Sequence, residues 1–374
     1  MSLIEPFRIA IPDEVLDDLA TRLERTRIPS PPILDGGESV KVITDIEDLV
    51  AYWRDGYDWR AQERRLNAVA PHYRTTIDDI GIHFIHVRGK GPNPLPLLLA
   101  NGWPSSFVEY LGVLGHLTDP AAYGGDPDDA FDVVIPAMPG YGFSEQCANR
   151  HLDRVMIAGL FDRLMVDRLG YDRYVAHGDD IGGGVVNRLG MRHPGTVRAI
   201  QTANWLKPHG AVTDEDYLAA ERRWESERGA YAHVQATRPQ ILTYGLLDSP
   251  IGLAAWILEK FLTWSDPATR DNLTADDLLT NVMIYWANRA IGNTVRLYAV
   301  DSGPLGADDV VSVPASVLVT REPELPVPPE SWLRQAYPRL TRIATVEEGG
   351  HFLAQESPLV FTDAVRTAFR PYRD

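Results

Sequence analysis

The chain has 374 residues, of which 44% are hydrophobic and 24% charged, ordinary values for a globular protein that exclude a collagen-like rod, a coiled coil and a disordered chain. Its 36 Lys and Arg against 52 Asp and Glu give a net charge of −16. Nucleic acid is therefore not expected as the main ligand, because phosphate binding needs clustered Lys and Arg. The single cysteine, Cys147, excludes an intrachain disulfide and a Cys-rich zinc site.

Neither a signal peptide nor a membrane span is expected from the sequence. Residues 1–6 lack the basic and apolar regions of a signal peptide. No apolar run approaches the ~18 residues of a membrane span, and residues 251–258 are among the longest. We therefore expect a soluble, cytoplasmic protein without a membrane span.

Residues 1–70 have a helical pattern. Pro12 followed by two acidic residues is a favourable helix start, because proline fits the first turn and acids complement the helix dipole there. One apolar face then recurs at helical spacing, at Leu16, Leu19 and Leu23. Further helical stretches cover residues 46–53 and 59–69. The pattern predicts an N-terminal helical lead-in that packs on a larger domain.

Strands and helices alternate from residue 71 to residue 206. Helical spacing marks residues 156–164 and 185–191. Short apolar or alternating runs predict strands at 74–78, 82–87, 96–100, 131–136 and 174–177. This alternation predicts the first half of an α/β core with a mostly parallel sheet flanked by helices.

Residues 207–303 interrupt the alternation, because they contain helical runs only. The strand pattern returns at 315–320 and 343–346, and a helix from Pro358 closes the chain. We therefore expect a helical cap at 207–303, inserted between the two halves of the core, with the second half at 304–374.

The glycine-rich turn at residues 178–184 is the strongest local signal for chemistry. A nucleophile on a strained strand-to-helix bend needs small residues two places to each side. Centring the pattern on Asp180 places Gly178 and Gly182 there, whereas centring it on Asp179 places the bulky His177. Asp180 is the favoured nucleophile, with Asp179 and a plain tight turn as alternatives. A P-loop is excluded, because no Gly-Lys-Ser/Thr follows.

Other strand ends supply the remaining groups of a hydrolase site. Trp103, in the turn after strand 96–100, can aim its N–H at a developing oxyanion, with Ile181 supplying a second N–H. His351 follows two glycines after the last strand. Glu322 and Glu324 lie between strand 315–320 and His351, so the chain order is nucleophile, acid, base, as in α/β-hydrolases.

Taken together, these motifs resemble the microsomal-type epoxide hydrolases of the α/β-hydrolase fold over nearly the whole chain. The motifs that carry the resemblance are residues 52–54, 57–59, 82–87, 101–106, 139–144, the strand-to-helix turn around Asp180 (the nucleophile elbow), 248–256, 280–286 and 349–352.

The resemblance implies roles for individual residues. It places the nucleophile on Asp180, the general base on His351 and the supporting acid on Glu324, with Glu322 as the alternative. It also places two cap tyrosines on Tyr231 and Tyr298, which spacing alone would not select from 15 tyrosines. Trp103 and Ile181 are expected to form the oxyanion hole and to line the substrate pocket. No metal or organic cofactor is implied.

Three positions depart from the family pattern, in which His, Gly and Trp usually stand where Asn101, Asp179 and Ile181 stand here. Asn101 should leave the Trp103 N–H in place. Asp179 adds a second carboxylate beside the nucleophile, which can raise one of the two pKa values. Ile181 replaces a large aromatic residue, so a wider pocket is expected.

The resemblance implies an epoxide hydrolase, a hydrolase acting on ether bonds, whose partners are an apolar epoxide and water. A haloalkane dehalogenase also uses a catalytic Asp and His. It needs, however, a halide-binding tryptophan beside the nucleophile, where Ile181 stands. A non-catalytic small-molecule binder is the alternative from another class, and a serine esterase is disfavoured because no Ser occupies the elbow. The epoxide, the regiochemistry, the enantiopreference and the oligomeric state, including a homodimer, stay open.

Overall fold

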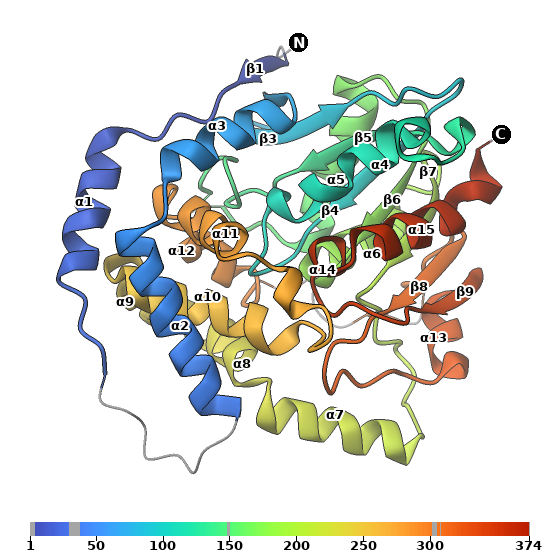
Figure 1. Cartoon of the computed structure of the whole chain (residues 1–374). Coiled ribbons are helices and arrows are strands. Elements are labelled where there is room, and N and C mark those ends of the chain that lie inside the picture. Colours follow the sequence, from blue (N-terminus) through green and yellow to red (C-terminus); the bar gives the residue numbers. More distant parts are fainter. Residues whose placement is uncertain (1–3, 30–37, 148–149, 301–304, 307, 374) are drawn as a thin grey trace.

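The computed structural model describes residues 4–29, 38–147, 150–300, 305–306 and 308–373 (Figure 1). These residues contain a nine-stranded sheet with the order β1-β2-β3-β5-β4-β6-β7-β8-β9. The strands are β1 (Glu5–Phe7), β2 (His72–Ile77), β3 (Ile80–Val87), β4 (Leu95–Ala100), β5 (Phe131–Pro136), β6 (Tyr174–Gly178), β7 (Val197–Thr202), β8 (Ala315–Val319) and β9 (Leu340–Thr345).

The sheet is antiparallel at one side and parallel over the rest. The pairs β1–β2, β2–β3 and β3–β5 are antiparallel, and every pair from β5–β4 to β8–β9 is parallel. Strands β5, β6 and β8 are buried along their whole length, as strands covered by helices on both faces must be. The predicted α/β fold with a mostly parallel sheet is confirmed.

Helices flank this sheet and also form two groups beside it (Figure 1). The core helices are η1 (Phe107–Val113), α4 (Leu114–Thr118), α5 (Arg154–Arg163), α6 (Asp180–Arg192), α13 (Glu330–Ala336), α14 (Leu353–Glu356) and α15 (Pro358–Phe369). The inserted segment contributes α7 (Glu215–Glu227), α8 (Ala230–Thr237), α9 (Pro239–Asp248), α10 (Pro250–Trp264), α11 (Ala275–Ala287) and α12 (Ile291–Arg296). Its described residues contain helices and no strand.

Side chains of α11 tie the inserted helices, which we call the cap, to the core. The Asn281 amide donates to the Pro104 carbonyl at 2.7 Å, and the Tyr285 hydroxyl donates to the Ser105 carbonyl at 2.9 Å. Both carbonyls belong to the loop that follows β4. The cap is therefore fastened next to the turn that carries Trp103.

The N-terminal segment differs from its helical prediction at one place. Helices α1 (Asp13–Glu24), α2 (Glu38–Asp55) and α3 (Trp59–Val69) are present as expected. Residues 5–7, however, form strand β1, in register with residues 72–74 of β2. The hydrogen-bonding groups on the open edge of β2 pair with this short stretch, which is a tertiary effect that periodicity does not report.

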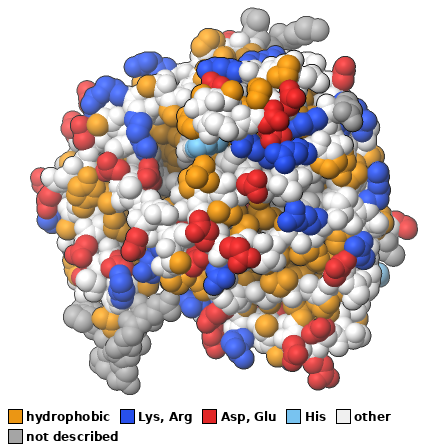
Figure 2. All heavy atoms as spheres, turned by 45° about the vertical axis from the view of Figure 1, so that its right-hand side comes forward, with side chains coloured by type: hydrophobic (Ala, Val, Ile, Leu, Met, Phe, Trp, Pro, Cys, Tyr) orange, Lys and Arg blue, Asp and Glu red, His pale blue; other side chains and the backbone are white. Residues whose placement is uncertain are grey.

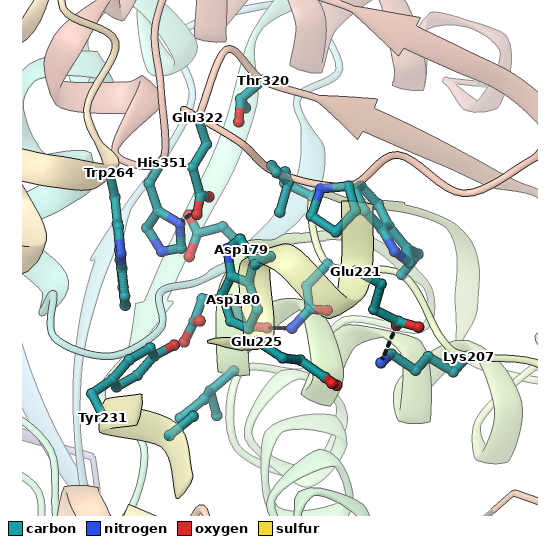
Figure 3. Close-up of a pocket in the computed structure, with 18 of the residues that line it drawn as sticks. Asp179, Asp180, Lys207, Glu221, Glu225, Tyr231, Trp264, Thr320, Glu322 and His351 are labelled. Atoms are coloured by element: carbon teal, nitrogen blue, oxygen red, sulfur yellow. Dashed lines mark hydrogen bonds and ion pairs between the residues drawn. The ribbon is translucent and has the colours of Figure 1, made fainter. Parts of the chain in front are cut away.

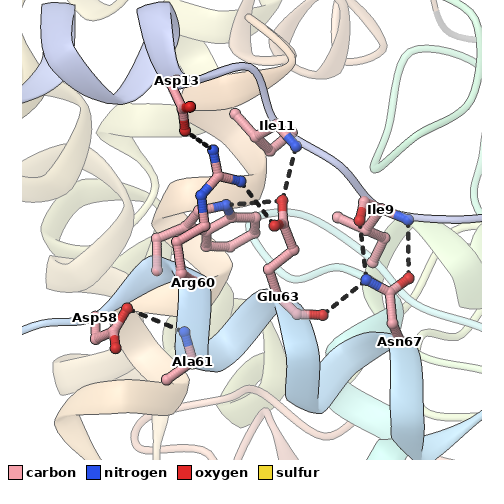
Figure 4. Close-up of polar contacts among 9 residues, drawn as sticks. Ile9, Ile11, Asp13, Asp58, Arg60, Ala61, Glu63 and Asn67 are labelled. Atoms are coloured by element: carbon pink, nitrogen blue, oxygen red, sulfur yellow. Dashed lines mark hydrogen bonds and ion pairs between the residues drawn. The ribbon is translucent and has the colours of Figure 1, made fainter.

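Polar contacts hold the start of the chain against α3 (Figure 4). The Asn67 amide exchanges two hydrogen bonds of 2.9 Å with the backbone of Ile9. The Glu63 carboxylate accepts from the Ile11 N–H at 2.7 Å. On the other side, α2 packs against α10, and the Tyr57 hydroxyl bonds to Thr280 of α11 at 2.9 Å. The segment thus bridges the core and the cap.

Acidic and basic side chains are interspersed on the face shown in Figure 2, with hydrophobic side chains between them. The net charge of −16 is therefore not gathered into one acidic patch on this face. Among the described residues, no single helix is long and apolar enough to cross a membrane, and α9 with α10 meets those criteria only as a pair bent by 116°.

Candidate active site

The turn between β6 and α6 holds Asp180 in a strained conformation. Its φ of +42° lies in the left-handed region, which L residues rarely adopt. A Cβ on Gly178 would lie 2.6 Å from the Gly182 carbonyl, and a Cβ on Gly182 would lie 2.0 Å from the Ala100 carbonyl oxygen. Glycine is therefore required on both sides of Asp180, which is the geometry that the small-x-nucleophile-x-small pattern predicts.

Two neighbouring loops hold Asp180 in place. The Trp103 N–H, in the loop after β4, donates to Asp180 Oδ1 at 2.9 Å. The Asn204 amide, just after β7, donates to the Asp180 backbone carbonyl at 2.5 Å. Ile181 lies in the first turn of α6, whose N–H groups have no carbonyl partner within the helix. No contact of the described residues joins the Ile181 N–H to the Asp180 carboxylate. The predicted Trp103 donor is present, and Asn204 was not anticipated.

His351 is paired with Glu322 and not with Glu324, which corrects the acid implied by the family resemblance. His351 Nδ1 lies 2.6 Å from Glu322 Oε2, and the Glu322 side chain is only 7% exposed (Figure 3). Glu324, at φ +62°, is 43% exposed and accepts from Arg228 Nε at 2.9 Å. A turn closed by the Leu325 N–H on the Glu322 carbonyl directs the two carboxylates to different sides.

The charges around His351 raise the pKa of its ring. Burial lowers its pKa, but the carboxylates of Glu322, Asp180 and Asp179 outweigh this effect and raise the pKa to about 9. At neutral pH the ring is therefore an imidazolium between carboxylates. The backbone N–H of His351 also donates to the Trp264 carbonyl at 3.0 Å, which fixes the loop against α10.

Glu356 anchors the His351 loop from below. Its buried carboxylate accepts from the N–H groups of Gly350 at 2.9 Å, Phe352 at 3.0 Å and Asp266 at 2.8 Å. The carboxylate thereby provides an acceptor for backbone N–H groups that would otherwise be buried without a hydrogen-bond partner. Nothing in the sequence around Glu356 distinguishes it from a surface glutamate, so the sequence analysis missed it.

Asp179 forms a buried carboxyl pair with Glu109 of η1 next to Asp180. The Tyr110 hydroxyl donates to Asp179 Oδ2 at 2.7 Å, and Glu109 is 1% exposed. Burial and the neighbouring Asp179 charge raise the pKa of Glu109 well above its usual value, while burial raises the pKa of Asp179 to about 6. One proton shared between the two carboxyls satisfies both. Asp179 is thus engaged with Tyr110 and Glu109, whereas the Asp180 carboxylate accepts from the Trp103 N–H.

Tyr231 of α8 and Tyr298, just after α12, meet above the Trp103 indole. The Tyr231 ring stacks on it at 5.5 Å and the Tyr298 ring meets it edge-on at 6.0 Å. Burial, followed by the Asp180 charge, raises the pKa of both phenols well above the usual 10. Figure 3 shows Tyr231 extending toward Asp180. The Tyr298 hydroxyl is buried without a hydrogen-bond partner among the described residues. Both phenols are therefore protonated donors.

These groups line one cavity of about 460 Å³ between cap and core. Asp180, His351, Tyr231, Tyr298 and Ile181 all line it. The Trp103 side chain does not, which corrects its expected place in the pocket wall. Its indole is fully buried beneath the two tyrosines, so only its backbone N–H serves the site.

The rest of the cavity wall combines apolar side chains with polar and charged ones. Its apolar lining includes Trp205, Trp224, Trp264, Leu325 and Pro326. Among the charged ones, Lys207 and Glu221 form an ion pair at 2.5 Å (Figure 3). In the described part of the chain, no group of three or more His, Cys, Asp or Glu is placed to hold a metal ion.

Glu322→Gln is expected to lower the pKa of His351 below its native value of about 9, because the ring loses its nearest negative charge. Because the pKa of His351 is higher in the folded than in the unfolded protein, protonation of the ring stabilises the fold. This contribution is fully present below about pH 6.5 and is lost as the pH rises through about 9. In Glu322→Gln that pH-dependent loss of stability should shrink. NMR titration of the ring and urea unfolding between pH 6 and 10 measure both effects.

Glu324→Gln is the matched control, since it removes the same charge two residues away. It should leave the pKa of His351 and the pH dependence of stability nearly unchanged, because its partner is Arg228 at the surface. A larger effect from Glu324→Gln than from Glu322→Gln would contradict the assignment of Glu322.

Comparisons with known proteins identify the family of the chain. Residues 4–110 match the family model "Epoxide hydrolase N terminus", and residues 96–240 match "alpha/beta hydrolase fold". Epoxide hydrolase 1 of Oryctolagus cuniculus is 33% identical over 95% of this chain and 86% of its own length.

Solved structures extend the similarity to three dimensions. The juvenile hormone epoxide hydrolase of the silkworm Bombyx mori is 30% identical, with a TM-score of 0.87 over 100% of this chain and 95% of its own. The Aspergillus niger epoxide hydrolase is 26% identical, with a TM-score of 0.84 over 98% of this chain and 96% of its own. The chain belongs to the epoxide hydrolase family of the α/β-hydrolase fold.

Proposed function

We propose that the protein converts an apolar epoxide to a vicinal diol through a covalent ester on Asp180. One observation carries the proposal: the Asp180 carboxylate shares a cavity with the His351–Glu322 pair and two protonated phenols. A nucleophile, a base with its orienting acid and two proton donors are the groups that this two-step reaction needs.

The first step opens the epoxide. Because the Trp103 N–H holds Oδ1 of Asp180, the other oxygen, Oδ2, attacks a ring carbon. The carbon–oxygen bond of the epoxide breaks, and a phenol transfers its proton to the leaving oxygen. A carboxylate needs no base to activate it, unlike a serine hydroxyl. The products of this step are a glycol monoester on Asp180 and a phenolate.

The second step hydrolyses the ester. Formation of the ester removes the negative charge of Asp180, one of the charges that raise the pKa of His351. The imidazolium then returns its proton to the phenolate, and the neutral ring takes a proton from water as the water attacks the ester carbonyl. The Trp103 N–H, with Ile181 as the expected second donor, stabilises the oxyanion, each donor contributing about 2.7–4 kcal/mol.

An oxygen-isotope experiment tests this route, because it shows whether the new diol oxygen comes from Asp180 or from water. In a single turnover in heavy-oxygen water with enzyme in excess, the first diol should carry no label, because its new oxygen comes from Asp180. After hydrolysis the label should be in the Asp180 side chain, detected by mass spectrometry of the peptide. Label in the first diol would show direct attack by water and would contradict the covalent route.

A haloalkane dehalogenase is the nearest alternative, and the structure disfavours it. Ile181 stands beside the nucleophile and offers no indole N–H, and the Trp103 indole N–H is buried beneath the two tyrosines. Neither position presents a side-chain donor to a halide. Halide release from a chloroalkane would favour this alternative, and tight binding of an apolar epoxide without turnover would favour a non-catalytic binder.

A further inference from the structure

Lys260 is a buried basic residue near the C-terminal end of α10, outside the groups assigned above. Only 7% of the residue is exposed. Its ammonium nitrogen lies 4.4 Å from the centre of the Tyr231 ring and 5.4 Å from that of the Trp264 ring. Lysines are almost never buried unless a partner compensates the charge. The face of a proposed catalytic phenol is therefore covered by a positive charge.

The neighbouring Glu259 forms an ion pair with this lysine. Burial lowers the pKa of Lys260, and Arg228 acts in the same direction, while the ion pair with Glu259 favours the charged form. The Glu259 side chain is 36% exposed, so water screens its charge, whereas Lys260 lies against the ring. The Glu259 charge itself raises the pKa of Tyr231, while the Lys260 ammonium lies over the face of the ring, where negative charge of the phenolate is delocalised.

The two phenols of the site differ in this respect. Tyr298 meets Trp103 and Tyr231 through ring contacts. Among the cation–ring contacts of the described residues, none involves Tyr298. Both phenols are buried, and Tyr231 is the one whose ring faces a cation among the described residues, so that cation can stabilise its anion.

We propose that Lys260 is a positioning residue that acts through Tyr231: its ammonium stabilises the Tyr231 phenolate formed during ring opening and so makes Tyr231, rather than Tyr298, the proton donor. This inference rests on the proposed epoxide hydrolysis and assigns the phenol that donates the proton in its first step.

The charge balance of the step explains why the cation accelerates it. As Asp180 forms its bond to carbon, its negative charge is consumed. The electron pair of the breaking carbon–oxygen bond takes the proton of Tyr231, which leaves the charge on the phenolate and its ring. Negative charge therefore moves onto the ring that Lys260 covers. An interaction that strengthens along the reaction lowers the barrier, whereas one that is constant does not.

The test compares Lys260→Met with Lys260→Arg, using rapid mixing of the full chain with a styrene-type epoxide. Lys260→Met keeps the length of the side chain and removes the charge. It should slow ester formation by about 10- to 30-fold, the size expected for a desolvated cation–π contact. Hydrolysis of the ester should be unchanged, because Tyr231 is not used in that attack. Lys260→Arg should restore most of the rate.

A second measurement separates electrostatics from packing. Difluorotyrosine at position 231 is a stronger acid than tyrosine and should recover much of the rate lost in Lys260→Met. Fluorine NMR of the same residue should show a higher phenol pKa in Lys260→Met than with Lys260 present, whether or not the protein turns over. A packing defect would not be rescued by a more acidic phenol.

The outcomes are distinguishable. Ester formation by Lys260→Met at the native rate, or a slow rate that the fluorinated residue does not improve, would overturn the role of Lys260 and leave the epoxide hydrolase proposal intact. Slowing in Tyr298→Phe but not in Tyr231→Phe would overturn the choice of donor. Absence of any ester with the native chain would overturn both proposals.

Discussion

Asp180→Ala is expected to abolish epoxide turnover, with a fall of more than about 10⁴-fold, because removal of a nucleophile eliminates the covalent route. Diol formation and mass spectrometry of the quenched protein measure the two consequences. No adduct of protein and epoxide should form. The fold should survive, since the Asn204 amide holds the backbone carbonyl of residue 180 and the turn glycines are unchanged.

Asp179→Asn is the matched control for this prediction. It removes the charge of the adjacent carboxyl but keeps an oxygen that can accept from the Tyr110 hydroxyl. Ester formation should persist, with the adduct on the peptide that contains Asp180. An adduct that disappears in Asp179→Asn but persists in Asp180→Ala would show that the nucleophile is Asp179 and would overturn the assignment.

His351→Gln is expected to trap the ester. The first step does not use the imidazole as a base, so one equivalent of epoxide should add to the protein. The second step should slow by about 10²–10⁴-fold, the usual contribution of a general base. Intact-protein mass spectrometry should show the mass of the epoxide added to nearly every molecule, and the adduct should decay slowly.

The double variant Asp180→Ala, His351→Gln locates that adduct. It should remain unmodified under the same conditions, because the accepting carboxylate is gone. Modification of the double variant would mean that the epoxide alkylates another side chain, and the trapped species in His351→Gln would then not be the proposed intermediate.

The buried pair of Asp179 and Glu109 suggests how a second carboxyl is tolerated beside the nucleophile. Two ionised carboxylates in a buried site would repel each other and Asp180. The raised pKa of Glu109 relieves this, since a shared proton removes one negative charge from the cluster. Asp179 and Asp180 both line the cavity and both act on His351, but Asp179 is the one paired with Tyr110 and Glu109.

Local features of the sequence were enough to predict much of the fold and part of the candidate site. Apolar runs bounded by turns identified strands such as β4 and β5, because side-chain periodicity reflects which faces are buried. The elbow around Asp180 was also readable, since the glycines that permit the turn are neighbours in the chain. The family motifs placed His351 and the two cap tyrosines, although spacing alone would not have selected the tyrosines.

Only the tertiary structure decided which side chains meet. Glu322 and Glu324 are two residues apart and chemically alike, and Arg228 of the cap and the path of the loop determine which of them turns inward. The placement of Lys260 over Tyr231 depends on how α8 packs beside α10. These contacts join segments that are distant in the chain, so their geometry follows from the packing of the whole fold and leaves no local pattern in the sequence.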